Sequence, residues 1–247
     1  MPKGGEAAER KVMVLTGASG RLGRALCEEF AKRYDIVAVS RTRRPSVASN
    51  LQSFVDPLQP NRKLSVNEHP VFELHVDLAL PQAIERVVEV TMARHGRVDV
   101  LVNAAGLPGH GWLLAGGMAN AERVMRVNAL APVELAARFA DVCWRHDDLG
   151  NKERNRCVVN VSSAAAVAVA TESRTAVFAA SKAALNLFTA HLASELEPFG
   201  VRAAAVAPVD FPAEVSVDRV VAGVNRLIEG DETGRLLLVW SDGDELV

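Results

Sequence analysis

The stretch Lys11–Gly23 constrains the fold of this chain more than any other. Val12–Leu15 is a short apolar run with two β-branched residues, which is typical of a buried parallel strand. Gly17, Gly20 and Gly23 follow at a spacing of three, and an amphipathic helical pattern comes next. A strand, a glycine turn and a helix together form an anion site, because glycines let a pyrophosphate approach the N–H groups at the positive end of the helix.

The rest of the chain alternates predicted strands and helices. Strands are predicted at 12–15, 36–39, 71–76, 98–103, 158–161, 201–206 and 235–240. Helices are predicted from the glycine turn to about 34 and over 81–95, 119–144, 173–197 and 217–229, with a short one at 46–54 and a solvated loop at 145–156. Repeated βαβ units predict an α/β fold with a Rossmann-type doubly wound parallel sheet. We expect one domain over 1–247, with a flexible N-terminus at 1–10.

Composition narrows the possible functions. The net charge is −2 and the basic residues are dispersed, which argues against a nucleic-acid surface. The three cysteines lack CxxC spacing, and the six histidines lack the spacing of metal ligands. No signal peptide is apparent, and the apolar run at 158–170 is too short to span a bilayer. We therefore expect a cytoplasmic protein with a small-molecule substrate and no metal, nucleic acid or membrane partner.

An ordered series of motifs resembles the short-chain dehydrogenase/reductase family along nearly the whole chain. The motifs are Thr16–Gly23 (TGASGRLG), Asp77-Leu78, Asn103–Gly106 (NAAG), Asn128, Asn160–Ser163 (NVSS), Ala180–Ala184 (ASKAA) and Pro208. The resemblance implies a nicotinamide-dependent oxidoreductase that forms a homodimer or homotetramer. One departure lies in the turn, where Arg21 stands at a position that is commonly glycine. The ending Arg21-Leu22-Gly23 is similar to that of pteridine reductases.

The resemblance also implies which residues bind the cofactor. Asp77 and Leu78 would border the adenine, and Asn103 and Ala104 would line the path below the ribose. The remaining implied contacts are Gly17, Ser19, Gly20, Arg21, Leu22, Gly23, Lys182 and Pro208.

The choice between NADP(H) and NAD(H) is predicted from charge. A carboxylate that holds the ribose 2′-hydroxyl should stand at the end of the second strand, where this chain has Ser40 and Arg41 instead. These residues favour a 2′-phosphate, and Arg21 would add a second cation. Arg43 and Arg44 are interpreted as an ordinary solvated basic run. NADP(H) is therefore preferred over NAD(H).

The predicted catalytic residues include one departure from the family pattern. The resemblance implies that Asn128 holds a water linked to the lysine, that Ser163 binds a substrate carbonyl, and that Lys182 binds the nicotinamide ribose. A tyrosine is expected one helical turn before Lys182, and Phe178 stands there. Phe178 has no proton to donate, and the single tyrosine of the chain, Tyr34, is predicted far from the site.

Three hypotheses follow from this pattern. The first is an NADPH-dependent oxidoreductase acting on a carbonyl, C=N or C=C group, whose proton comes from a water held by Ser163 or Lys182, from His110 or from the substrate. The second is a catalytically inactive NADP(H)-binding sensor or scaffold, and the third is a non-redox enzyme. Ser163, Asn128 and Lys182 favour the first, although Ser163 alone can also be interpreted as a strand-end cap. The segment after Pro208 is short, which predicts an open site.

Overall fold

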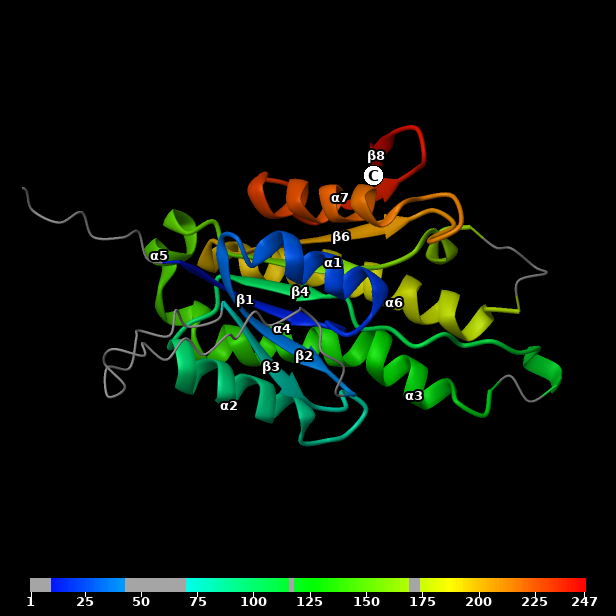
Figure 1. Cartoon of the computed structure of the whole chain (residues 1–247), viewed down its shortest axis with the longest axis horizontal. Coiled ribbons are helices and arrows are strands. Elements are labelled where there is room, and N and C mark those ends of the chain that lie inside the picture. The colour runs from blue at the N-terminus through cyan, green and yellow to red at the C-terminus, as the bar shows by residue number, and fades with distance from the viewer. Residues whose placement is uncertain (1–9, 43–69, 116–117, 169–173) are drawn as a thin grey trace, which may run out of the picture.

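A single sheet forms the centre of the protein in the computed structural model, which describes residues 10–42, 70–115, 118–168 and 174–247. Its strand order is β3-β2-β1-β4-β5-β6-β7-β8, and all neighbours are parallel except β7 and β8 (Figure 1). The strands are β1 Lys11–Thr16, β2 Tyr34–Ser40, β3 Val71–His75, β4 Val100–Asn103, β5 Cys157–Val161, β6 Arg202–Pro208, β7 Leu236–Val239 and β8 Asp244–Leu246. The predicted α/β Rossmann-type fold is confirmed.

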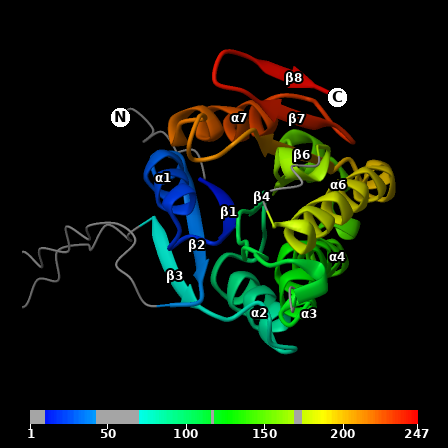
Figure 2. The same cartoon turned by 90° about the vertical axis from the view of Figure 1, so that its right-hand side faces the viewer.

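Helices cover both faces of the sheet (Figure 2). The α-helices are α1 Arg21–Phe30, α2 Ala83–His95, α3 Ala121–Met125, α4 Ala131–Val142, α5 Asp148–Glu153, α6 Ala176–Leu196 and α7 Val217–Glu229. Short 3₁₀ turns lie at Leu113–Ala115, Trp144–His146, Ala164–Ala166 and Glu197–Phe199, and one π turn, Arg126–Leu130, joins α3 to α4. Helices α1 and α7 pack on one face, and α2, α4 and α6 pack on the other.

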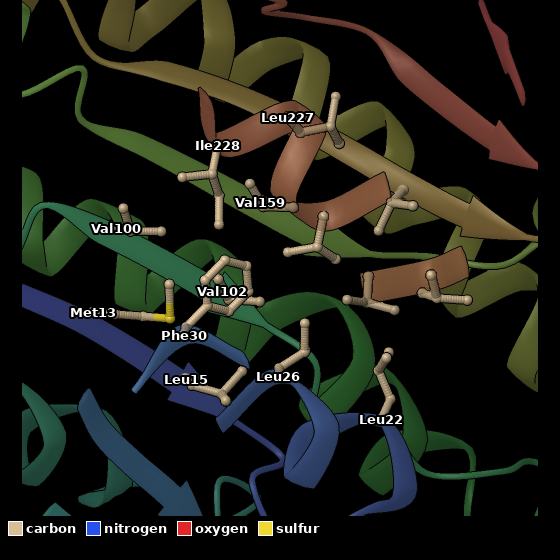
Figure 3. Packing of buried hydrophobic residues seen from close by; sticks show 14 of the residues in the cluster. Met13, Leu15, Leu22, Leu26, Phe30, Val100, Val102, Val159, Leu227 and Ile228 are labelled. Atoms are coloured by element: carbon tan, nitrogen blue, oxygen red, sulfur yellow. The ribbon is translucent and has the colours of Figure 1, made fainter. Parts of the chain in front are cut away.

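Two hydrophobic clusters fill the space between the sheet and its helices. In β1, Met13 and Leu15 face the α1 and α7 side, whereas Val14 faces the α2, α4 and α6 side. Figure 3 shows the first cluster, in which Phe30 of α1 and Leu227 of α7 close over the sheet. A central parallel strand buried on both faces has to be apolar throughout, which explains the continuous apolar run of β1.

The charged stretch at 145–156 is not the solvated loop that we expected. It contains the helix α5, and the Arg156 side chain at its end is buried. The guanidinium of Arg156 donates to Asp99 Oδ1 at 3.0 Å, to Asn151 Oδ1 at 2.6 Å and to Asp147 Oδ2 at 2.9 Å. A buried charge needs such partners, and here Asn151 and Asp147 come from the same stretch while Asp99 comes from a segment distant in the sequence.

Other boundaries also differ from the prediction. Helix α1 ends at Phe30, and Tyr34 begins β2 instead of ending the helix. Arg10, expected in a flexible N-terminus, donates to Asp35 Oδ1 at 2.8 Å and to the carbonyl oxygen of Tyr34 at 2.6 Å. The helix predicted over 119–144 is divided by the π turn, and β8 was not predicted. The rest of the expected N-terminal segment and the short helix at 46–54 lie outside the described residues.

One described helical segment, Ala176–Phe199, is long and apolar enough by length and composition to cross a membrane, with a mean hydropathy of 1.2. In this fold the segment packs on β6 and α4 and buries the polar side chains of Ser181, Lys182 and Thr189. These features are those of a core helix covering a sheet.

Candidate active site

In the turn after β1, two of the three glycines occupy positions where a side chain would collide with the backbone. Gly17 has φ +73°, and a Cβ there would lie 2.7 Å from the backbone of Ala104. A Cβ on Gly23 would overlap the carbonyl oxygen of Gly17. Gly20 is the N-cap residue directly before α1, and no described side chain caps that end of the helix. The N–H groups of the first turn are therefore available to an anion, and the missing Cβ atoms leave room for a dinucleotide backbone.

Two adjoining cavities lie beside this turn, and both are lined by Gly17, Gly20 and Ala104. The larger has a volume of about 1770 Å³ and the smaller about 220 Å³. They lie where the carboxyl ends of β1 and β4 meet, at the switch point where open α/β sheets bind ligands. Most of the site residues predicted from the sequence line one or both of these cavities. They are Gly17, Ser19, Gly20, Arg21, Leu22, Gly23, Ser40, Arg41, Asp77, Leu78, Ala104, Ser163, Phe178, Lys182 and Pro208.

Asn103 lines neither cavity, although the sequence placed it on the cofactor path. Its side chain is buried, and its Nδ2 donates to Asn160 Oδ1 at 2.9 Å. Asn160 in turn donates to Thr189 Oγ1 of α6 at 2.8 Å. These hydrogen bonds join β4, β5 and α6, so the structure gives Asn103 a supporting position behind the site.

Asn128 is also fully buried and lies within the π turn between α3 and α4. Its Oδ1 accepts from the N–H of Leu107 at 2.7 Å, and its Nδ2 donates to the carbonyl oxygen of Leu107 at 3.0 Å. The same Nδ2 donates to Ser181 Oγ at 3.0 Å. Asn128 therefore ties the loop after β4 to α6. The sequence analysis missed Ser181, whose place directly before Lys182 was the available signal.

Lys182 is 4% exposed, and its Nζ donates to the carbonyl oxygen of Val161 at 2.7 Å. Its Nζ lies 5.9 Å from the centroid of the Phe178 ring, and both side chains line the larger cavity. Burial lowers the pKa of the Lys182 ammonium to about 8, because a charged group loses hydration in the interior. The amine therefore exchanges its proton close to neutral pH.

Ser163 combines the two interpretations that the sequence left open. Its Oγ accepts from the N–H of Ala165 at 3.2 Å and so caps the 3₁₀ turn after β5. The residue also lines the larger cavity. Since a hydroxyl both accepts and donates, this cap leaves its hydrogen able to donate to a ligand.

The smaller cavity contains a paired carboxylate. Asp77 Oδ2 accepts from Arg123 Nη2 at 2.7 Å, and Oδ1 accepts from the N–H of Ala79 at 3.0 Å. Burial raises the pKa of the Asp77 carboxyl, but the hydrogen bonds from Ala79 and Arg123 outweigh it. The charge of Arg41 also lowers the pKa of this carboxyl. The pKa of Asp77 is therefore below its usual value. The Asp77 carboxylate is thus paired with Arg123, and Arg41 adds a further positive charge to the lining of this cavity.

The other polar residues near the second strand are arranged differently from the expectation. Ser40 Oγ lies 3.2 Å from His75 Nδ1 on the neighbouring strand, a contact that sequence reasoning missed. Arg21 lines the larger cavity, whereas Arg41 lines the smaller one. Arg43 and Arg44 lie outside the described ranges.

Several residues of the larger cavity were not predicted. His110 was named only as a possible proton source, and the structure adds Trp112, Arg174, Asp210 and Phe211 to the lining. They come from three connections that meet only in the folded chain. In the sequence, the only indication of these lining residues was Trp112, a tryptophan within a glycine-rich loop. Helix α7 begins at Val217 as expected, and the short segment before it contributes Asp210 and Phe211.

Comparison with known proteins identifies sequence relatives. A family model described as short chain dehydrogenase matches residues 11–219. A short chain dehydrogenase of Pseudocercospora fijiensis is 30% identical over 83% of this chain and 61% of its own length. Dehydrogenase/reductase SDR family member 7B of Bos taurus is 29% identical over 90% of this chain and 64% of its own length. The chain thus spans less than two thirds of the length of both relatives.

Solved structures with the same architecture include complexes with either cofactor. A metagenomic short-chain oxidoreductase in complex with NADP has a TM-score of 0.70 at 26% identity, covering 93% of this chain and 96% of that one. An oxidoreductase of the short chain dehydrogenase/reductase family from Brucella ovis, in complex with a partially ordered NAD, has a TM-score of 0.70 at 26% identity, covering 94% of this chain and all of that one. One of these neighbours thus binds NADP and the other binds NAD.

Proposed function

The chain belongs to the short-chain dehydrogenase family, and on that basis we propose that it is an NADPH-dependent oxidoreductase acting on a carbonyl, C=N or C=C group of a small molecule. One observation carries this proposal: the glycine turn, Ser163 and Lys182 border a single cavity. A bound NADPH would supply a hydride to the substrate carbon. The residues of the chain would bind both molecules, exclude water and deliver a proton.

Charge supports the choice of NADPH. Arg41 and Asp77 line the smaller cavity, and the ion pair with Arg123 neutralises the Asp77 carboxylate. A 2′-phosphate would therefore meet a positive environment, whereas no described side chain at the end of β2 offers a carboxylate to a 2′-hydroxyl. Relatives of similar identity bind NADP in one case and NAD in another, so the argument depends on the charges of this chain.

Phe178 in place of the usual tyrosine requires another proton source. Lys182 is suited to this task because a general acid works best when its pKa is near the working pH. Its ammonium has three N–H donors, of which one binds Val161. The other two remain for ribose hydroxyls and for a water that passes the proton to the substrate. In this proposal, Ser163 donates to the substrate oxygen and Asn128 positions the surrounding loop.

The test compares two added phenols. NADPH oxidation is measured with a panel of carbonyl compounds for the natural chain, for Phe178→Tyr and for Phe211→Tyr, after calorimetric titration with NADPH and NADH. We expect Phe178→Tyr to raise the rate by roughly 10²–10⁴-fold, the usual effect of a positioned general acid. Phe211→Tyr adds a phenol to the same cavity from the connection between β6 and α7, not from the helix that carries Lys182, and should leave the rate unchanged.

The alternative is a catalytically inactive NADP(H)-binding sensor or scaffold. It predicts tight NADPH binding and no turnover by either the natural chain or Phe178→Tyr. The retention of Ser163 at the cavity supports the enzyme, because a protein that only binds a dinucleotide does not need that hydroxyl.

We also propose that the protein is cytoplasmic and forms a homodimer or homotetramer. Exposed apolar side chains on the outer faces of two long helices, Val142 of α4 and Leu187 of α6, support an association between copies. Light scattering tests the oligomer, and cell fractionation tests the location.

A further inference from the structure

Trp112 and Arg174 form a stacked pair in the lining of the larger cavity. The Arg174 Cζ lies 4.8 Å from the centroid of the Trp112 ring. Beside them, the N–H of Gly111 donates to the carbonyl oxygen of Arg174 at 2.8 Å. Both side chains are exposed, with Trp112 at 51%, so the pair lies at the mouth of the cavity and not at its base.

The stack leaves the hydrogen-bonding edge of Arg174 available. A guanidinium stacked on an aromatic ring uses its face, whereas its five N–H donors lie in its plane. Within the described ranges no carboxylate pairs with Arg174, although Asp210 lines the same cavity. A planar fork of N–H groups held in a fixed direction matches a carboxylate, which it binds through two parallel hydrogen bonds.

Most of the residues that line the cavity shared by this pair and Lys182 are apolar. Lys182 follows Ala176, the first residue of α6, by six residues, which corresponds to roughly 9 Å along the helix axis, and Arg174 lies two residues before that helix. The cavity lining includes Leu113, Leu114, Ala164, Ala165, Phe178 and Ala179. A molecule that reaches from Lys182 to Arg174 would therefore contact hydrocarbon along its length and a cation at its outer end.

We infer that the substrate is an oxo carboxylic acid with an apolar chain between its two functional groups. The ketone lies beside Lys182 and Ser163, the chain covers the alanine and leucine wall, and the carboxylate binds Arg174 at the mouth. This inference rests on the proposed function of the cavity, and it adds the chemical class of the substrate.

The test measures discrimination between an acid and its ester. Calorimetry in saturating NADP⁺, which cannot reduce a ketone, gives the Kd values of medium-chain oxo acids and of their methyl esters. We expect the natural chain to bind the acid about 10- to 100-fold more tightly, as a charge-assisted hydrogen-bonded pair predicts. Arg174→Gln keeps a planar group of similar shape without the charge and should bind acid and ester equally. Arg86→Gln, an exposed arginine on α2, should retain the preference.

The same measurements separate this inference from simpler explanations. If the pair only joins two loops, Arg174→Gln weakens acid and ester by the same factor, and the inference is overturned. Equal or undetectable binding of acid and ester to the natural chain also overturns it. The NADP⁺ titration that precedes these measurements reports on the proposed function separately, and Arg174→Gln should leave the Kd of NADP⁺ unchanged.

Discussion

The Nζ of Lys182 lies 5.9 Å from the ring centroid of Phe178, one helical turn away on the same face of α6. This distance is at the outer limit of cation–π attraction, which extends to about 6 Å from the ring centroid. The hydrogen bond to Val161 offsets only part of the cost of burial, and the pKa of the ammonium falls to about 8. The charge at position 182 therefore reduces the stability of the fold.

Removing that charge should stabilise the protein. The pKa of Lys182 falls from 10.5 to about 8 on folding, so between these values the unfolded chain binds more protons and stability rises with pH. Below pH 8 the full penalty is present. We expect Lys182→Met to raise the free energy of unfolding at pH 7 by about 2–3 kcal/mol. The gain should shrink from pH 8 to pH 10.

The measurement is urea unfolding of both proteins across that pH range. Lys32→Met removes an exposed ammonium on the surface and serves as the control, with a change below about 0.5 kcal/mol. A pH-independent difference between the natural chain and Lys182→Met would contradict the prediction.

Arg41 should decide the preference between the two dinucleotides. Replacing it with glutamine removes a cation from the smaller cavity, while Asp77 keeps its partner Arg123. Hydrogen bonds to charged groups contribute about 1.5–3 kcal/mol, so the Kd of NADPH should rise roughly 10- to 100-fold. The Kd of NADH should change little, because it carries no 2′-phosphate. Calorimetry measures both, and an equal loss for the two dinucleotides would refute this role.

The parts of the fold that could be predicted depend on local patterns. The apolar run of β1 and the glycines at 17 and 23 lie within a few residues of one another, and each restricts the backbone by itself. Strand β8 could not be predicted in this way. Asp244–Leu246 is short and polar, and it becomes a strand only because its backbone pairs with β7. A short, charged edge strand resembles an ordinary surface segment in the sequence.

The candidate site was likewise predictable only where its residues are marked by a local pattern in the sequence. Ser163 and Lys182 could be located because strand ends and helix spacing are readable from the sequence. The partners of Asn128 were not predictable, since its amide contacts the backbone of Leu107 across the fold. The contact of Arg174 with Trp112 joins two loops whose approach depends on the packing of the whole sheet.

Gly23 should not tolerate a side chain. A Cβ there would overlap the carbonyl oxygen of Gly17 and approach the Cα of Ala18 to 2.7 Å, so the turn would have to open. We expect Gly23→Ala to abolish measurable NADPH binding and to lower the free energy of unfolding by at least about 2 kcal/mol. Gly243→Ala, where no atom lies within 4 Å, should match the natural chain in both measurements. Unchanged NADPH affinity in Gly23→Ala would show that the turn is not the pyrophosphate site.

Asp99 should be among the most sensitive positions outside the cavities. Its buried carboxylate accepts from the N–H of Val12 at 2.8 Å, from Arg156 Nε at 3.0 Å and from Arg97 Nε at 3.2 Å. Asp99→Asn keeps the shape but leaves the buried Arg156 guanidinium without its buried counter-charge, which costs about 3–5 kcal/mol in comparable pairs. Urea unfolding should register this loss. As the control, Glu85→Gln breaks an exposed ion pair with Arg138 and should lower the free energy of unfolding by less than about 1 kcal/mol. Similar losses for the two variants would mean that burial does not set the strength of the Asp99 pair.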